Sequence, residues 1–570
     1  MAVNKQIIKF LFLLSVLGLF GQETSIKITI EFIDEPIAVA LAKLDNSIAQ
    51  QLSYNPQILP QNTTITRSFE DQIPEVILVG ILGPTYQLKN IGNYIIIQKA
   101  PLTKKEKTAF QLKGGIKDAS SGKDLSGVSV YEINSLKSTL SNEQGKFELQ
   151  ANTEFKEATF VVSRRFYQDT IIRITKPEQL TQPIALKQEE PSKKGIMIRE
   201  RVKVFSSGLA KFFTSIELRK NAQNVNFVDT RLFQLSLVPS IGTNRKMSGQ
   251  IKNKISLNLI SGYSYGVHGV ELGGFYNLDR EEVIGAQFGG FGNTVGGEVR
   301  GAQFGGFINT TKDYVNGVQM AGFINVASDS VEGFQAAGFT NTTKEMSGFQ
   351  VAGFNNRTMK VSGYQLSGFM NTTGEMDGVQ IAGFINIAKE VKGLQLSVIN
   401  IADTVSSGVP IGLISIVKKN GFLSPALEYT DAIPVGFAMR VGVETFYSIL
   451  AIGTNPDNYW SVGGGFGSKR FTSVNRKLFL NPELRWSSLT QGKIRENEDS
   501  NLIQLNFNLG YQLFKRLSIA GGPSLNFFFT NHLNAQGDPI IDLANSTIID
   551  GQGSRNRYQM WAGYTLNIGF

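Results

Sequence analysis

The chain contains no cysteine and only two histidines, His268 and His532, in 570 residues. The absence of cysteine excludes disulfide bonds, thiolate metal sites, a cysteine nucleophile and a lipid anchor attached to cysteine. The scarcity of histidine removes the side chain that most often serves as general base or zinc ligand. No H-E-x-x-H motif is present. We therefore expect a protein that is not an enzyme and that holds neither a metal nor another cofactor.

Long apolar runs are also scarce. The run from Phe10 to Phe20 follows Lys5 and Lys9 and is too short to span a bilayer comfortably, which predicts a signal peptide over residues 1–22. No later segment has eighteen uninterrupted apolar residues. An exported chain without such a segment is either secreted or a membrane β-barrel. The net charge of +9 lies largely in short connectors such as Lys104–Lys107, so we expect no nucleic-acid partner.

Glycine, in contrast, is abundant and marks a repeat. Ten copies of one sequence motif lie within residues 269–416, at spacings of sixteen and then fifteen residues. The motif is clearest in GVQIAGFIN from Gly378. The copies begin at Gly269, Gly285, Gly301, Gly317, Gly333, Gly348, Gly363, Gly378, Gly393 and Gly408. A unit this short has no core of its own, so its neighbours must complete it in a closed barrel or a stacked solenoid.

We favour the barrel for these repeats, because the flanking segments have the pattern of strands in one continuous sheet. Met376, Gly378, Gln380, Ala382, Phe384 and Asn386 would then face the interior in rows. The solenoid is the alternative and accounts better for the uniform turns. The repeats contain one regular polar array, which we interpret as a structural amide ladder with sugar binding as the competing role. Its members are Gln287, Gln303, Gln319, Gln335, Gln350, Gln365, Gln380 and Gln395.

The C-terminal segments have the clearest strand pattern. From Ile503 to Leu513, apolar and polar residues alternate strictly over the length of a tilted membrane strand. The chain ends with Tyr564, Leu566, Ile568 and Phe570 in alternation, which resembles the signal read by the barrel assembly machinery. We expect an antiparallel outer-membrane β-barrel over residues 231–570 that incorporates the repeats.

Residues 23–100 are predicted to form β-α-β, β-α-β units. The strand around Ile28–Ile30, the helix Ala38–Leu44, the segment Ser53–Pro56 and the closing Asn93–Ile97 resemble the STN module, the secretin and TonB N-terminal domain. The resemblance implies a small α/β domain in the periplasm that contacts other envelope proteins.

Residues 101–190 contain glycine- and aspartate-rich turns between short strands. Gly115–Asp118, Gly122–Val130 and Asn142–Leu149 are similar to the carboxypeptidase-regulatory-like β-sandwich, which carries no peptidase chemistry. We interpret Asp118 and its neighbouring carboxylates as turn caps rather than calcium ligands. Residues 191–230 are expected to be a polar linker.

The repeats themselves resemble the Leptospira-type surface repeats, which imply a location in the envelope and no activity. The combined prediction is a mainly β outer-membrane protein with periplasmic N-terminal domains and a structural or binding role. The alternative is a TonB-linked component for uptake or signalling. The lack of a recognisable plug favours the first, because energy-coupled uptake needs a gate.

Overall fold

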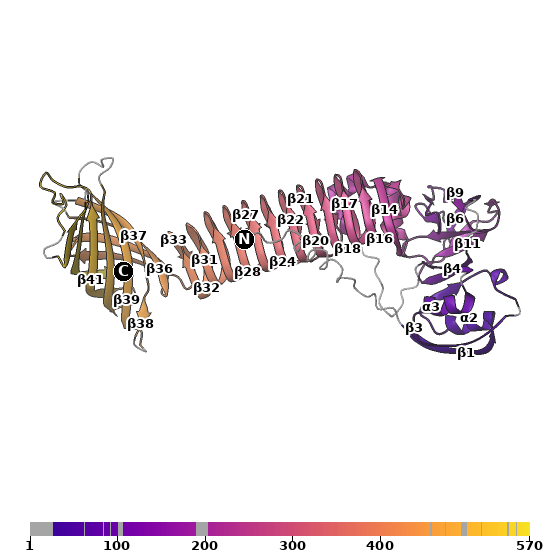
Figure 1. Ribbon diagram of the computed structural model, residues 1–570, viewed down its shortest axis with the longest axis horizontal. Coiled ribbons are helices and arrows are strands. Elements are labelled where there is room, and N and C mark those ends of the chain that lie inside the picture. The colour runs from indigo at the N-terminus through magenta and orange to yellow at the C-terminus, as the bar shows by residue number, and fades with distance from the viewer. Residues whose placement is uncertain are drawn as a thin grey trace, which may run out of the picture. The chain divides into compact units, whose positions relative to one another are not determined.

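The computed structural model describes residues 27–570, apart from 62, 84, 92, 101–106, 190–202, 456–458, 473–474, 492–498, 515, 544–546 and 554–555. The expected signal peptide therefore lies outside the described residues. The chain divides into two compact units, Met1–Asp329 and Ser330–Phe570. Both consist mainly of strands, as expected (Figure 1). Within the described part of the chain, no helix is long and apolar enough to cross a membrane.

The first domain has the α/β element order that the sequence predicts. Its elements are β1 (Ile28–Pro36), α2 (Ile37–Asp45), β2 (Gln51–Ser53), η1 (Pro56–Ile58), β3 (Thr64–Gln72), α3 (Pro74–Leu82), β4 (Tyr86–Ile91) and β5 (Tyr94–Lys99). β1 pairs with β3, and β5 lies between β2 and β4 in a second sheet. Both helices contribute buried residues to a core with Phe32 and Ile97, including Leu41 and Leu78. The apolar helical stripe of the sequence is therefore the core face of α2.

The second domain is a β-sandwich. Its strands are β6 (Thr108–Asp118), β7 (Ser129–Glu132), β8 (Ser138–Leu140), β9 (Lys146–Thr153), β10 (Ala158–Ser163), β11 (Thr170–Ile174), β12 (Glu178–Gln179) and β13 (Ile184–Leu186). One sheet has the order β11-β10-β7-β8, and the other contains β12, β6, β13 and β9. Asp118 accepts hydrogen bonds from the backbone N–H groups of Ser120 and Ser121 at 3.0 and 2.7 Å, which is the turn-capping role expected for it.

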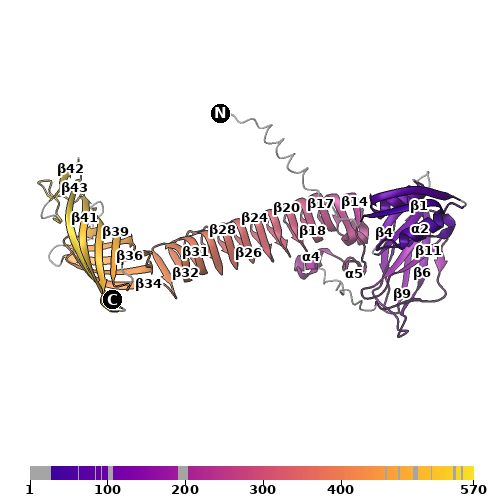
Figure 2. The ribbon, with the colours of Figure 1, turned by 90° about the horizontal axis from the view of Figure 1, so that it is seen from below.

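The segment expected to be a polar linker contains helices. They are η2 (Lys203–Ser206), α4 (Gly208–Phe213) and α5 (Ile216–Asn224). Ser215 caps α5 by accepting a hydrogen bond from the Leu218 N–H at 3.2 Å. These helices pack through Phe205 and Leu218 against Tyr263 and Tyr276 of the strand stack (Figure 2).

The repeats form a stack of parallel strands, one repeat per rung. In the first unit the stack comprises β14 (Asp229–Val238), β15 (Ile241–Gly242), η3 (Arg245–Gln250), β16 (Ile251–Asn258), β17 (Ser261–Gly273), β18 (Tyr276–Gly289), β19 (Gly292–Val295), β20 (Val299–Gly305), β21 (Ile308–Thr311), β22 (Val315–Ala321) and β23 (Ile324–Ala327). In the second it comprises β24 (Ser330–Ala337), β25 (Thr340–Thr342), β26 (Glu345–Ala352), β27 (Asn355–Arg357), β28 (Lys360–Ser367), β29 (Met370–Thr372), β30 (Glu375–Ala382), β31 (Ile385–Leu396), β32 (Ile399–Ile411) and β33 (Ile414–Val417).

This arrangement confirms the solenoid alternative and shows that the barrel interpretation of the repeats was wrong. Equivalent residues of successive repeats are direct partners, as Gly363 and Gly378 are between β28 and β30. Such pairing is parallel, whereas a barrel meander requires antiparallel neighbours. A repeat length of sixteen and then fifteen residues returns the chain to an equivalent position on each rung, which is also why the turns are similar.

The glycine that opens each repeat is required by the stacking. Gly378 has φ +130°, and a Cβ added there would lie 2.1 Å from the carbonyl oxygen of Gly363 on the preceding rung. No side chain fits at that distance, and L-residues rarely adopt that φ. The glycine at the start of the repeat is therefore needed because the backbones of two successive rungs approach closely there.

The last part of the second unit is an antiparallel barrel of eight strands. They are β34 (Phe422–Thr430), β35 (Val435–Val443), β36 (Phe446–Asn455), β37 (Tyr459–Gly467), β39 (Leu478–Thr490), β40 (Ser500–Gln512), β41 (Ser518–Thr530) and β43 (Arg557–Gly569), with short β38 (Arg470–Phe471) and β42 (Ile549–Gln552) beside them. The barrel closes because β34 pairs with β43. It thus begins near Phe422 rather than at residue 231.

Candidate functional site

The glutamine array lies inside the strand stack as a hydrogen-bonded ladder. Each Gln side chain is fully buried, and its Nε2 donates to the Oε1 of the preceding Gln at 2.7–2.9 Å wherever the bond is described. An asparagine ladder runs beside it; for example, Asn371 Nδ2 donates to Asn386 Oδ1 at 3.0 Å. Buried amides bonded to one another have no face left for a sugar hydroxyl. The geometry therefore favours the structural role expected for the Gln ladder.

Two buried carboxylates terminate the Gln ladder at its N-terminal end. Gln287 Nε2 donates to Glu271 Oε2 at 2.7 Å and to Asp279 Oδ2 at 2.6 Å. Ser264 Oγ donates to the other oxygen of Asp279 at 2.5 Å. Burial raises the pKa of Asp279 well above its usual value, and the charge of Glu271 raises that pKa further. The pair therefore retains a proton on Asp279 under conditions in which an exposed aspartate is ionised.

Sequence reasoning missed one motif in this region. Gly262 to Gly266 has the G-x-S-x-G pattern of a hydrolase nucleophile elbow. In the structure this stretch is the start of β17, and Ser264 is fully buried rather than exposed at a turn before a helix. Ser264 donates to a carboxylate, and His268 pairs with Glu282 at 2.9 Å instead. Ser264 is thus a structural partner of Asp279.

The phenylalanines of the repeats lie on the outside of the stack. Met376, Gln380, Ala382 and Asn386 are buried as expected, but Phe384 is 43% exposed. The expectation that phenylalanine lines the interior was wrong, because the chain turns at this position and the strand alternation is interrupted there. Within each unit, the phenylalanine rings of successive repeats stack with centroids 4.8–5.2 Å apart and nearly parallel planes.

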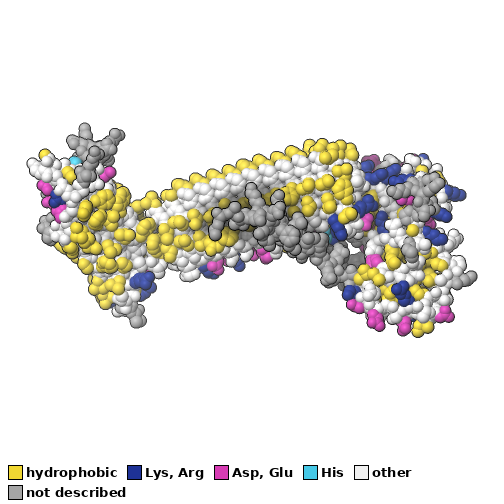
Figure 3. Space-filling model, in the orientation of Figure 1, with side chains coloured by type: hydrophobic (Ala, Val, Ile, Leu, Met, Phe, Trp, Pro, Cys, Tyr) yellow, Lys and Arg dark blue, Asp and Glu magenta, His cyan; other side chains and the backbone are white. Residues whose placement is uncertain are grey.

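This aromatic stack forms part of an apolar surface on the strands of each unit (Figure 3). Because the rings cover one another's faces, they present their edges to the surroundings. A sugar or a nucleobase binds an aromatic residue through the ring face. The stack therefore presents hydrocarbon to its surroundings and no stacking platform.

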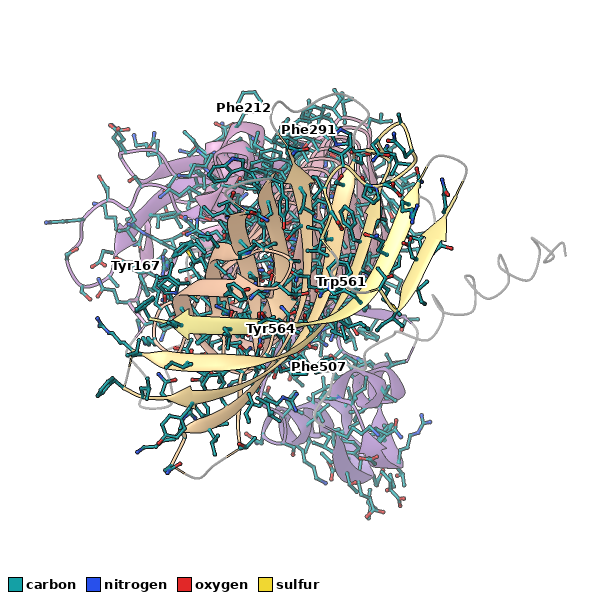
Figure 4. The ribbon with its side chains drawn as sticks, turned by 90° about the vertical axis from the view of Figure 1, so that its left-hand side faces the viewer. Tyr167, Phe212, Phe291, Phe507, Trp561 and Tyr564 are labelled. Atoms are coloured by element: carbon teal, nitrogen blue, oxygen red, sulfur yellow. The ribbon has the colours of Figure 1, made fainter. Side chains whose placement is uncertain are left out.

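The barrel has polar residues inside and apolar residues outside. Along β40, Gln504, Asn506 and Asn508 are 1% exposed. The intervening Leu505, Phe507, Leu509 and Tyr511 are 36–56% exposed. Figure 4 labels Phe507 and Tyr564 on strands of this barrel. A soluble barrel has the opposite polarity, so this pattern is typical of strands in contact with lipid.

The lumen is filled by a ring of ion pairs. Arg440 contacts Glu428 at 2.6 Å and Glu483 at 2.7 Å. Arg485 donates to the same two carboxylates, at 2.8 Å to Glu428 and at 3.0 Å to Glu483. All four side chains are at most 6% exposed, and Tyr447 Oη donates to Glu483 at 2.9 Å. Each charge has two partners of opposite sign, so the four buried side chains form a neutral ring.

An apolar cluster fills another part of the same lumen. Leu502, Phe528 and Trp561 from the strands pack with Ile541 and Leu543 from the segment after β41. Trp561 Nε1 donates to Asp431 at 2.6 Å. Eight strands enclose only enough space for side chains. Among the described residues, this cluster and the ring of ion pairs are therefore packed inside the barrel.

The residues expected to form the assembly signal lie on the strand that closes the barrel. Tyr564, Leu566 and Ile568 of β43 face outward and are 44–53% exposed, and Phe570 follows directly. The backbone N–H of Phe570 donates to Pro425 O at 2.8 Å. Their recognition by the assembly machinery stays a prediction.

Comparison with known proteins identifies one part of the chain. Residues 112–196 match the family model described as the CarboxypepD_reg-like domain, which confirms the resemblance seen in the β-sandwich. No curated protein and no solved structure matches the chain. The resemblances of residues 23–100 to the STN module and of the repeats to the Leptospira-type surface repeats stay predictions.

Proposed function

We propose that the protein is a non-enzymatic component of the cell envelope, anchored in the outer membrane by its C-terminal barrel. The observation that carries the proposal is the inverted polarity of this closed barrel, whose strands such as β40 expose apolar side chains and bury polar ones. A strand of 13 residues such as β40 is roughly 43 Å long, and at a tilt of about 40° it spans roughly 33 Å. That height matches the hydrocarbon core of a bilayer, about 30 Å.

The N-terminal domains would then lie in the periplasm and bind envelope proteins, while the strand stack serves a structural or binding role. The alternative, TonB-linked uptake, needs a lumen that opens, and here four paired charges and an apolar cluster occupy that space. We therefore favour membrane anchoring over transport as the function of the barrel.

We also propose that the protein catalyses no reaction. The described residues hold no group of three histidine, cysteine or acidic side chains placed to bind a metal ion. The G-x-S-x-G serine is buried and lacks a histidine partner among its described contacts. The test is a screen of the purified protein on glycans and peptides; turnover that a single carboxylate substitution abolishes would contradict the proposal.

Membrane anchoring is tested by fractionation with two matched variants. Phe507 of the barrel and Phe166 of the β-sandwich are both 54% exposed. Lysine in place of a lipid-facing residue costs about 2–4 kcal/mol near the bilayer midplane. Phe507→Lys should therefore reduce the amount of protein in the outer-membrane fraction, and Phe166→Lys should leave it unchanged. Equal amounts of wild type and both variants in the soluble fraction would refute the proposal.

A further inference from the structure

The helices α4 and α5 border an open cavity of about 680 Å³ whose lining is strongly basic. Among the described residues, five cationic side chains and no carboxylate line it: Lys203, Lys211, Arg219, Lys220 and Lys312. Lys312 comes from the strand stack of the same unit, so the cavity lies between the helices and the stack. Phe205 and Ile216 contribute apolar surface to the same lining.

The same helices expose large apolar side chains. Phe212 is 80% exposed, Ile216 is 66% exposed, and Leu209 is 37% exposed. The ring of the neighbouring Phe213 contacts the Phe212 ring edge-to-face, with centroids 5.1 Å apart, and stacks on Tyr276 with centroids 5.7 Å apart. The outward position of Phe212 is therefore not a result of poor packing, because the chain supplies one phenylalanine to the core and one to the surface. Figure 4 labels Phe212.

The hairpin is held in a defined conformation. Arg219 Nη1 donates to the carbonyl oxygen of Lys211 at 3.0 Å and also to that of Thr214, which ties α5 to the end of α4. Val204, Ala210 and Leu218 are at most 1% exposed and pack against the strand stack. The exposed residues are thus presented by a fixed element.

Nearby acids compensate little of the basic charge. Asp313 contacts Lys203 at 3.4 Å, and Glu217 of α5 contacts Lys246 outside the cavity. Among the described residues, no carboxylate forms an ion pair with Lys211, Lys220 or Lys312. The surface therefore keeps a net positive charge beside exposed aromatic and aliphatic groups.

This combination identifies the kind of partner. A free phosphate or a polyanion would use the cations but gives no reason for exposed Phe212 and Ile216. A neutral apolar partner would use these two residues but leaves the cations without counter-charge. An anionic lipid surface satisfies both, because its phosphates pair with lysine and arginine while short apolar side chains enter the acyl boundary.

We propose that the α4–α5 hairpin is an interfacial membrane-binding element that takes the phosphate groups of anionic phospholipids between Lys211, Arg219, Lys220 and Lys312. Phe212 and Ile216 insert beside them. This contact belongs to the first unit and does not depend on the barrel, which lies in the second. The protein would then engage lipid at two separate places in its chain.

The test uses the full chain held in amphipathic polymer, so that the barrel is covered. Because the chain lacks cysteine, Phe212→Cys provides a single site for a fluorophore that reports polarity. Vesicles of phosphatidylcholine with phosphatidylglycerol should shift its emission to the blue, and high salt should reverse the shift. Vesicles of phosphatidylcholine alone, and inorganic phosphate alone, should have little effect. Phe166→Cys, at the 54% exposed position of the β-sandwich, is the matched label control.

Charge reversal separates specific binding from general attraction. Lys211→Glu with Lys220→Glu should weaken partitioning to the anionic vesicles by roughly tenfold or more. The control variant reverses two exposed lysines of the β-sandwich, Lys123→Glu with Lys146→Glu. It has the same net charge as the first variant and should change partitioning to the anionic vesicles much less. Circular dichroism and the Phe212→Cys emission without vesicles check that both variants fold.

Equal weakening by the two pairs of substitutions, or equal emission shifts at positions 166 and 212, would overturn the proposal. A shift caused by inorganic phosphate alone would replace the lipid surface with a free anion as ligand and would overturn it too. Membrane anchoring by the barrel is unaffected by any of these outcomes, so the two proposals fail separately.

Discussion

The neutral Gln ladder ends at two ionisable side chains, Glu271 and Asp279. Within the ladder, each Gln whose bond is described donates to a residue nearer the N-terminus of the chain, so the N-terminal end of the ladder needs an acceptor. Two carboxylates supply it, and both accept from the two N–H groups of Gln287. Burial of two neighbouring carboxyl groups costs free energy. This cost is lower when Asp279 keeps its proton.

This protonation gives the first unit a defined pH dependence. The pKa of Asp279 is raised in the folded state, so the folded protein binds a proton that the unfolded chain has already lost. The contribution of this group to stability is therefore fully present below pH 3.8, its usual pKa, and is lost as the pH rises through the folded-state pKa.

Asp279→Asn should remove this dependence, because the amide mimics the protonated acid. We expect local stability at neutral pH to rise by about 1 kcal/mol or more. Hydrogen exchange of β17 and β18, corrected for the intrinsic effect of pH, measures it. Asp124→Asn, an exposed aspartate 3.7 Å from Lys117, is the control and should change little. A loss of stability at neutral pH in Asp279→Asn would show that the folded protein needs the ionised carboxylate.

At the residue scale, the repeat pattern predicted the buried amides but not the exposed phenylalanines. Regular spacing shows that Gln380 and Asn386 have equivalent neighbours, and polar groups in register bond to one another. Strict alternation fails at Phe384, because the chain bends at Gly383 and Phe384 between β30 and β31 and this bend shifts the side-chain phase. The acid pair was not predicted either, since it depends on contacts between rungs at one end of the stack.

At the scale of the element, the strand stack depends on ladders whose inner members have two partners. Gln365 donates to Gln350 at 2.8 Å and accepts from Gln380 at 2.7 Å. Gln395 donates to Gln380 at 2.7 Å, but its own Oε1 has no partner among the described residues, because Pro410 occupies the next rung. The ladder therefore ends where a proline replaces the glutamine.

Gln365→Met and Gln395→Met should reduce the local stability of the stack by different amounts, although the substitution is the same. The first leaves a donor and an acceptor buried without partners, at about 1–3 kcal/mol each, and the second leaves one acceptor. We expect the local stability measured by hydrogen exchange to fall by about twice as much in Gln365→Met. Equal losses would indicate that the ladder contributes only side-chain volume.

The elements differ in how far sequence could determine them. Strands such as β40 were predicted because strict alternation from Ile503 to Leu513 specifies one buried and one exposed face. The choice between barrel and solenoid for the repeats was decided wrongly, because both contain short strands and turns. Only the direction of pairing separates them, and that depends on partners one repeat away.

At the scale of the whole molecule, we expect that the protein does not conduct ions. The neutral ring of Arg440, Arg485, Glu428 and Glu483 and the apolar cluster around Trp561 fill the lumen. The full chain reconstituted in a planar bilayer should therefore give no steady current. Stable open events at moderate voltage, seen with several preparations, would support the uptake alternative instead.

The most direct test of the account is a cysteine scan along β40 in the reconstituted full chain, which the natural absence of cysteine permits. Labels at Leu505, Phe507 and Leu509 should be quenched by a lipid-soluble quencher, and labels at Gln504, Asn506 and Asn508 should be shielded from it. This period of two follows from the apolar exterior and the filled lumen. Quenching of all six positions by a water-soluble agent alone would contradict membrane anchoring by the barrel.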